Sequence, residues 1–146
     1  RQLIQAGNVE RAATLLGRIY GIRGTVVHGM QQGQAMGWPT ANLRIPADRV
    51  VPPDGVYAAR VIHSAETYDA IAYIGTRPTF GEGERLIEVN LLDQTCDLYG
   101  QEITVQFVAR VRGDHMFASA DELSKQIARD VEQARISLRH IPQGVQ

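Results

Sequence analysis

The stretch Ile103-Thr104-Val105-Gln106-Phe107-Val108-Ala109-Arg110-Val111-Arg112 decides the fold class of this 146-residue chain. Apolar side chains stand at every second position from Ile103 to Val111, and mostly polar ones stand between them. A period of two is typical of a β-strand that turns one face to a core and the other face away from it. Residues 103–112 are therefore predicted to form a strand with one buried and one largely polar face.

Shorter segments rich in Val, Ile and Tyr recur along the chain, and residue types of this kind favour strands. Pro and Gly mark irregular connections at 46–54 and 77–83. No helical pattern separates most of the segments, so the sequence predicts a mainly β fold, either an antiparallel sheet or a barrel. The further predicted strands are 19–28, 43–45, 55–63, 68–74 and 86–92.

Amphipathic helices are predicted at both ends of the chain. Ser119 and Glu122 form a capping box, and the apolar residues after them recur every three or four positions along a long C-terminal helix. This stripe consists of Leu123, Ile127, Val131, Ala134 and Leu138. We expect the stripe to cover the barrel wall and Pro142 to stop the helix. A short N-terminal helix is predicted between Asn8 and Gly17. Its apolar face would consist of Ala12, Ala13, Leu15 and Leu16.

Composition restricts the partners of the chain. It is 44% hydrophobic and 21% charged, with a formal net charge of −1. Near-neutral charge argues against nucleic acid as a partner, because nucleic-acid surfaces are normally strongly basic. No apolar run approaches the roughly 18 residues of a membrane-spanning helix, so no membrane partner is expected. The single cysteine, Cys96, cannot form an internal disulfide, which fits a reducing compartment, and we expect a cytoplasmic protein.

Several common types of active site lack their sequence signatures. The four histidines are scattered and there is one cysteine, so no zinc site is predicted. Neither a G-x-S-x-G elbow nor a G-x-G-x-x-G fingerprint occurs, so hydrolase and Rossmann oxidoreductase chemistry have no support. Lys125 is the only lysine among 15 Lys and Arg residues. Bound phosphates would therefore be met by Mg²⁺, backbone N–H groups or arginine.

The segment Gly33–Asn42, GQAMGWPTAN, is a candidate nucleotide site. Gly33 and Gly37 let the backbone turn sharply and approach a ligand closely. The Thr40 hydroxyl and the Asn42 amide oxygen are hard, neutral ligands of the kind that Mg²⁺ accepts beside substrate phosphates. Free backbone N–H groups in such a loop could hold phosphate oxygens. A turn without a ligand is the alternative that these residues leave open.

The segment Gly37-Trp38-Pro39-Thr40-Ala41-Asn42 resembles the G-[FY]-P-T-A-N signature of riboflavin kinases, with Trp in place of Phe or Tyr. Residues 7–17 resemble the linker helix that precedes this domain in bacterial bifunctional riboflavin kinase/FAD synthetases, whose N-terminal half is an adenylyltransferase. Further matches in the expected order are GTVVHG (Gly24–Gly29), GVY (Gly55–Tyr57), IGTRPTF (Ile74–Phe80), EV (Glu88–Val89) and DLYG (Asp97–Gly100).

The resemblance implies a fold, a domain division and a reaction. Riboflavin kinases are closed barrels of six antiparallel strands with a C-terminal helix. We therefore expect residues 1–17 to be a linker helix from a preceding adenylyltransferase domain, and residues 18–146 to be the barrel domain with its helix. The implied reaction transfers the γ-phosphoryl group of ATP, with Mg²⁺, to the ribityl 5′-hydroxyl of riboflavin and gives FMN and ADP.

The resemblance also implies roles for individual residues. Glu88 would be the general base, because an alcohol is a poor nucleophile until its proton is removed. Thr40 and Asn42 would hold Mg²⁺ together with the nucleotide. The implied nucleotide-binding residues are Gly29, Gly33, Gly37, Pro39, Thr40, Asn42, Tyr99 and Gly100. The implied flavin-binding residues are Glu88, Leu98, Arg112 and Phe117.

Alternatives remain open at the level of the sequence. From strand alternation alone, a solvent-exposed glutamate is the ordinary interpretation of Glu88, and an Asx-turn would explain Asn42. Asn90 stands where the resemblance leads us to expect His, which puts a proton relay at this position in doubt. Asp97–Gly100 could be a simple hairpin turn, and Phe117 could anchor the final helix. The whole chain could also be a non-catalytic flavin- or nucleotide-binding barrel, or a protein-interaction domain.

Overall fold

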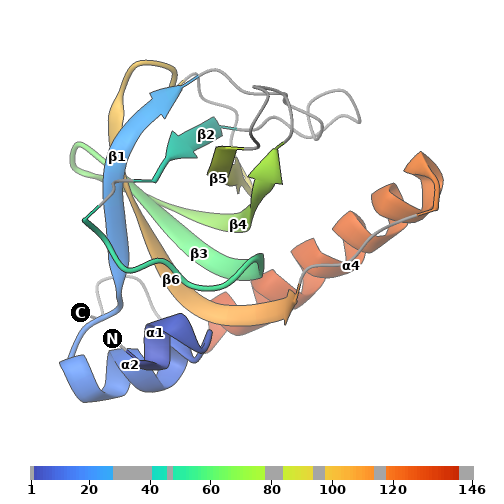
Figure 1. The fold of residues 1–146 in the computed structure, drawn as a ribbon. Coiled ribbons are helices and arrows are strands. Elements are labelled where there is room, and N and C mark those ends of the chain that lie inside the picture. The colour runs from blue at the N-terminus through green and yellow to red at the C-terminus, as the bar shows by residue number, and fades with distance from the viewer. Residues whose placement is uncertain are drawn as a thin grey trace.

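Six antiparallel strands close into a barrel, with two short helices at one end and a long helix along the outside (Figure 1). The computed structural model describes residues 2–27, 41–45, 48–77, 84–93, 98–113 and 118–141. The strands, in the barrel order β1-β2-β5-β4-β3-β6, are β1 (Gly21–Val27), β2 (Ala41–Arg44), β5 (Glu84–Leu91), β4 (Glu66–Arg77), β3 (Gly55–His63) and β6 (Glu102–Gly113). The helices are α1 (Gln2–Gln5), α2 (Val9–Leu16) and α4 (Ala120–Arg139).

The six strands confirm the predicted mainly β class and the closed barrel. β3 has the predicted bounds, whereas β4 begins two residues before its predicted start. Ser64 and Ala65 form a two-residue turn between these strands, and Ser64 adopts a positive φ of 54°. Turns of this kind usually carry Asn-Gly or Asp-Gly, so Ser-Ala gave no signal that the hairpin was so tight.

A hydrophobic cluster fills the barrel interior. Tyr57 of β3 and Phe107 of β6 are its largest fully buried members, and their rings meet edge to face with centroids 5.5 Å apart. The Tyr57 hydroxyl donates to the carbonyl of Pro53 at 2.8 Å. The interior is therefore a packed core, and ligand chemistry must take place on the outside or at the ends of the barrel.

Helix α4 covers part of the outer wall. The Ser119 hydroxyl accepts a hydrogen bond from the backbone N–H of Glu122 at 3.2 Å, as the capping box predicted. The first turns project beyond the barrel (Figure 1), and Leu123 is only partly buried. The remaining stripe packs on the outer side chains of β3, β4 and β6. Its buried members are Ile127, Val131, Ala134 and Leu138. Val108, predicted for the largely polar face of β6, is buried because it packs in the same cluster as these helix residues, and Gln106 of that face is also buried.

Arg60 of β3 fixes the C-terminal end of α4. Its Nη2 donates to the carbonyl oxygens of Leu138, at 3.0 Å, and of Ile141, and its Nε pairs with Asp69 at 3.2 Å. The last carbonyl groups of a helix have no partner within the helix and carry partial negative charge. A buried guanidinium therefore satisfies them and locks the helix to the barrel.

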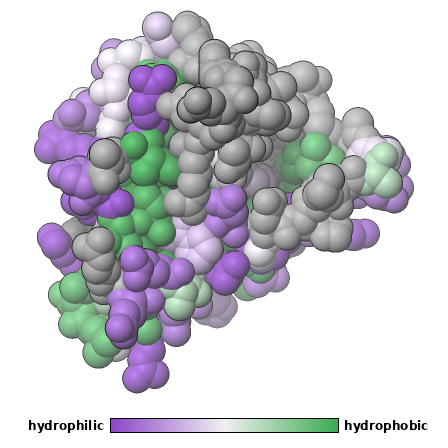
Figure 2. All heavy atoms as spheres, viewed as in Figure 1, coloured by the Kyte–Doolittle hydropathy of each residue, from purple (hydrophilic) through white to green (hydrophobic). Residues whose placement is uncertain are grey.

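The N-terminal helices close one end of the barrel. Asn8 caps α2 by accepting from the N–H of Arg11, and Gly17 ends it in the left-handed conformation, both as predicted. Helix α1 was not predicted. The predicted apolar face was partly wrong, because Leu15 and Leu16 are 69% and 55% exposed. Hydrophobic atoms are visible at this end of the molecule (Figure 2). The side chains that enter the interior cluster are instead Ile4, Val9 and Ala12.

No helix within the described ranges is long and apolar enough to cross a membrane.

Candidate active site

The strand register places three side chains in a row across the outer wall of the barrel. Asn42 of β2 lies opposite Glu88 of β5, and Glu88 lies opposite Tyr73 of β4. Directly paired residues on neighbouring strands project to the same face of a sheet. Ile87 and Val89, on either side of Glu88, belong to the interior cluster, so the row of three faces outward.

Two of the three side chains in this outward-facing row are buried. Glu88 is 5% exposed and Asn42 is 1% exposed. The structure therefore excludes the solvent-exposed glutamate that strand alternation alone allowed. Glu88 and its neighbours form instead a shielded polar region on the barrel wall, which is the environment in which charge–charge interactions are strong.

Asn42 has the properties of a ligand-binding side chain. Neither its amide nitrogen nor its amide oxygen has a hydrogen-bond partner among the residues that the structure describes, although both atoms are buried. An Asx-turn is therefore not formed. Leaving a buried polar group unpaired costs about 1–3 kcal/mol, so such groups usually serve a ligand or ion. A neutral, hard amide oxygen fits Mg²⁺. Thr40, the predicted second ligand, lies outside the described residues.

The structure offers no conventional metal cage in the part of the chain that it describes. Groups of three or more His, Cys, Asp or Glu side chains that could hold a metal ion do not occur among those residues. A cation at Asn42 would therefore meet Glu88 as the neighbouring carboxylate and would take most of its ligands from bound phosphates and water, as Mg²⁺ often does.

The end of β1 and the turn at Tyr99 and Gly100 lie beside this row. Val27, the last residue of β1, pairs with Asn42. Gly100, with φ of +78°, donates its N–H to the carbonyl of Val26 at 3.0 Å, so the turn at Tyr99 and Gly100 is attached to the same end of β1. Tyr99 is 53% exposed, whereas Leu98 is buried in the interior cluster. The predicted nucleotide-binding residues outside the described ranges are Gly29, Gly33, Gly37, Pro39 and Thr40.

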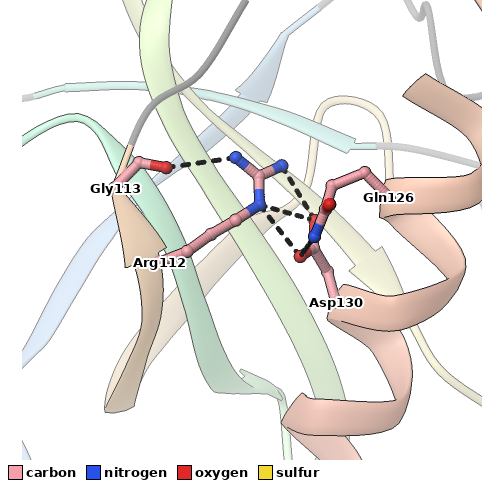
Figure 3. Close-up of polar contacts among 4 residues, drawn as sticks. All are labelled: Arg112, Gly113, Gln126 and Asp130. Atoms are coloured by element: carbon pink, nitrogen blue, oxygen red, sulfur yellow. Dashed lines mark hydrogen bonds and ion pairs between the residues drawn. The ribbon is translucent and has the colours of Figure 1, made fainter. Parts of the chain in front are cut away.

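Arg112 of β6 is bound to helix α4 (Figure 3). Its Nε donates to both carboxylate oxygens of Asp130, at 2.9 and 3.1 Å, and its Nη2 donates to Oδ2 at 2.8 Å. Gln126 donates to Oδ1 of Asp130 at 2.9 Å. Asp130 is 1% exposed, so this is a buried, charge-assisted network that orients the guanidinium. Phe117, the other residue predicted near Arg112, lies outside the described residues.

Asp130 was not among the predicted site residues, although the sequence held a signal for it. An acidic residue follows Ile127 by three positions and precedes Val131, so it interrupts the apolar stripe on the face that packs against the barrel. A carboxylate on such a face needs a cationic partner. Arg112 is that partner, and it reaches Asp130 from the end of β6.

Tyr73 lies between Glu88 and the Arg112–Asp130 pair. Burial raises the pKa of its hydroxyl far above the ordinary tyrosine value, the Asp130 carboxylate raises it further, Arg112 lowers it, and Glu88 raises it. All three charged groups therefore lie within electrostatic reach of this hydroxyl. The hydroxyl is buried and has no hydrogen-bond partner among the described residues. Tyr73 thus remains a neutral O–H group at neutral pH.

The structure brings only some of the predicted site residues together. Asn42 and Glu88 are direct neighbours, and Arg112 joins the same outer wall through Val56 and Tyr73, which lie opposite each other on β3 and β4. Asn90, two residues after Glu88, is 2% exposed and faces the same way, and its amide oxygen has no partner among the described residues. Leu98 packs inside the barrel and does not face this wall.

Solved structures of other proteins share this architecture. A Streptococcus pneumoniae protein named macrolide-efflux protein superposes with a TM-score of 0.84 at 40% identity, over 92% of this chain and 44% of that one. Riboflavin kinase from Trypanosoma brucei superposes with a TM-score of 0.58 at 26% identity, over 84% of this chain and 81% of that one.

Sequence comparison gives the same result for most of the chain. The bifunctional riboflavin kinase/FMN adenylyltransferase of Escherichia coli (strain K12) is 44% identical over 137 residues. These residues are 92% of this chain but 43% of that protein, so the chain spans less than half the length of this relative. The family model for Flavokinase, described as riboflavin kinase, matches residues 16–138. The chain therefore belongs to the riboflavin kinase family.

Proposed function

We propose that this chain phosphorylates riboflavin. The γ-phosphoryl group of ATP is transferred to the ribityl 5′-hydroxyl, and the products are FMN, ADP and a proton. The observation that carries this proposal is the pairing of Asn42 with Glu88. It places a buried amide that has no partner in the described part of the chain beside a shielded carboxylate on one outer wall. Membership of the riboflavin kinase family gives the substrate class.

Glu88 is proposed as the general base. Its carboxylate takes the proton of the 5′-hydroxyl while the new oxygen–phosphorus bond forms and the bond from the γ-phosphorus to the bridging oxygen of ADP breaks. Such a base typically contributes roughly 10²–10⁴ to the rate. The position of Glu88 between two ladder-paired strands holds the carboxylate in place, which phosphoryl transfer requires because it depends mainly on positioning and electrostatics.

Asn42 and Thr40 are proposed to hold Mg²⁺ with the nucleotide. The ion would supply positive charge to offset the phosphate oxygens during transfer. Both side chains are neutral, so they leave that charge available to the nucleotide. The remaining proposed nucleotide-binding residues are Gly29, Gly33, Gly37, Pro39, Tyr99 and Gly100.

The remaining proposed flavin-binding residues are Arg112, Leu98 and Phe117. Arg112 would present a guanidinium that Asp130 has already oriented. Leu98 is buried in the interior cluster, so its contribution would be to anchor the turn before Tyr99 rather than to touch the flavin.

We further propose that residues 1–17 connect this domain to a preceding FMN adenylyltransferase domain, and that the reaction takes place in the cytoplasm. The name of the E. coli relative includes the second activity, and this chain spans less than half of that protein. Ile4, Val9 and Ala12 pack into the barrel core, so this connection would be docked firmly on the kinase domain. The chain by itself would make FMN and no FAD.

Product analysis tests the proposal. The purified chain is incubated with riboflavin, ATP and Mg²⁺, and riboflavin, FMN and FAD are separated by chromatography, with an EDTA control. We expect FMN without FAD, and no FMN in EDTA. A folded chain that binds riboflavin but yields no FMN would overturn the kinase activity in favour of a flavin-binding module.

A further inference from the structure

We propose that Tyr73 contacts the acceptor substrate: its hydroxyl donates a hydrogen bond to an oxygen of the acceptor's polyol chain, beside the hydroxyl group that Glu88 deprotonates. This inference rests on the proposed function and extends it to a further residue. Neither the motifs nor the composition of the chain singled out Tyr73.

The order of the row gives the direction in which the acceptor extends. Asn42, Glu88 and Tyr73 stand on the consecutive barrel strands β2, β5 and β4. Neighbouring strands lie about 4.8 Å apart, so the row spans about 10 Å. If the phosphates lie at Asn42 and the reacting hydroxyl lies at Glu88, the rest of the acceptor continues toward Tyr73. A chain with a hydroxyl group on each successive carbon offers an oxygen at that distance.

The Tyr73 hydroxyl differs from the hydroxyls of Tyr57 and Tyr20 in its hydrogen bonding. Tyr57 donates its hydroxyl hydrogen to the carbonyl of Pro53, and Tyr20 donates to the carbonyl of Val50. The hydroxyl of Tyr73 is buried but has no partner among the described residues. A buried hydroxyl without a partner destabilises the folded protein, and a ligand oxygen would remove that cost.

Burial and the charges around Tyr73 keep its hydroxyl group protonated, so that it can donate a hydrogen bond. Burial disfavours loss of its proton most, the Asp130 and Glu88 carboxylates add to this effect, and Arg112 opposes it. The hydroxyl therefore stays neutral and presents an O–H beside the proposed base. Helix α4 contributes to this arrangement through Asp130, so the helix and the strand row act on the same hydroxyl group.

The test compares Tyr73→Phe with the matched control Tyr57→Phe. Each substitution removes one tyrosine hydroxyl group, from the outer wall at Tyr73 and from the barrel interior at Tyr57. Binding of riboflavin and of lumiflavin, which has a methyl group in place of the polyol chain, is measured by flavin fluorescence for both variants and the wild type. KM and kcat for riboflavin and the unfolding midpoint of the ligand-free protein are measured in parallel.

Tyr73→Phe should weaken riboflavin binding roughly 3- to 10-fold, the effect of one neutral hydrogen bond, and should leave lumiflavin binding unchanged. Its ligand-free unfolding midpoint should stay the same or rise, because an unpaired buried group has been removed. Tyr57→Phe should lower the midpoint and leave the riboflavin-to-lumiflavin affinity ratio unchanged. A merely structural role for Tyr73 would produce the Tyr57 pattern in both variants.

Failure of this inference is distinguishable from failure of the proposed function. A wild-type chain that makes FMN, with a Tyr73→Phe variant that keeps the wild-type affinity ratio, would overturn the inference and leave the kinase activity intact. A wild-type chain that makes no FMN would overturn the function. In that case, loss of the riboflavin preference in Tyr73→Phe would still support the polyol contact.

Discussion

Arg112 and Asp130 join the barrel to its covering helix through three hydrogen bonds of 2.8 to 3.1 Å. Asp130 is almost fully buried, whereas the Arg112 side chain is 21% exposed. The pair therefore does two things at once: it neutralises a carboxylate inside the helix–barrel contact, and it holds a guanidinium at the end of the wall that carries Glu88.

Substitution Asp130→Asn should lower the free energy of unfolding by about 3 kcal/mol, because breaking a buried ion pair from one side typically costs roughly 3–5 kcal/mol. The matched control is Asp93→Asn, which breaks the exposed pair with Arg135. An exposed pair is worth about 0–1 kcal/mol, so the control should lose little. Urea unfolding measures both, and equal losses would show that the Arg112–Asp130 pair is not a special anchor.

Substitution Glu88→Gln should reduce turnover by at least about 10²-fold while riboflavin binding persists, since the amide keeps the shape of the side chain but cannot accept the proton. The control is Glu102→Gln. Glu102 is an exposed carboxylate that pairs with Arg23, and its strand β6 lies opposite β5 in the barrel. It should keep wild-type turnover. Steady-state FMN production decides, and an unchanged rate in Glu88→Gln would remove the base assignment.

Substitution Asn42→Leu should separate stability from activity. It replaces two buried amide atoms, which have no hydrogen-bond partner within the described ranges, with an apolar group of similar size. The free energy of unfolding without ligand should therefore stay the same or rise. FMN formation should require much more Mg²⁺ or cease. Asn8→Leu, which removes the cap of α2, should do the reverse: stability falls by about 1 kcal/mol and the Mg²⁺ dependence is unchanged. A Mg²⁺ titration of FMN production in the three proteins distinguishes these outcomes.

Tyr73 should make the stability of the protein fall at high pH. Its pKa is raised in the folded state, mainly by burial, whereas the unfolded chain titrates near the ordinary value of about 10. Below that value both states hold the proton, and the contribution is fully present. Above it the unfolded state loses the proton first, so stability declines as pH rises. Urea unfolding at about pH 8 and pH 11 should show a smaller decline for Tyr73→Phe than for the wild type.

Local signals predicted the elements of this fold well. The alternation around Ile103–Arg112, the capping box at Ser119 and the caps of α2 each depend on residues close together in the sequence, and all were confirmed. The failures involve contacts between distant segments. Val108 is buried because α4 packs against it. Leu15 and Leu16 are exposed because α2 packs through Val9 and Ala12 instead.

The candidate site was predictable residue by residue but not as an arrangement. Asn42 and Glu88 were chosen from separate motifs, and nothing in the spacing of 46 positions shows that they become direct neighbours. Their pairing depends on β5 lying between β2 and β4, which is a property of barrel closure. Tyr73 gave no motif signal at all, and only the register that places it opposite Glu88 draws attention to it.

Barrel closure also guards against a register shift that would move Glu88 to the wrong face of β5. A shift of β5 by one position would turn Ile87 outward to the site and send the Glu88 carboxylate into the apolar core. In an open sheet, a strand at the edge could make this shift by breaking one ladder. Here β5 is bonded on both sides, to β2 and β4, so misplacement would break two ladders and bury a charge. A chain that folds at all is thereby committed to presenting its carboxylate on the correct side of the wall.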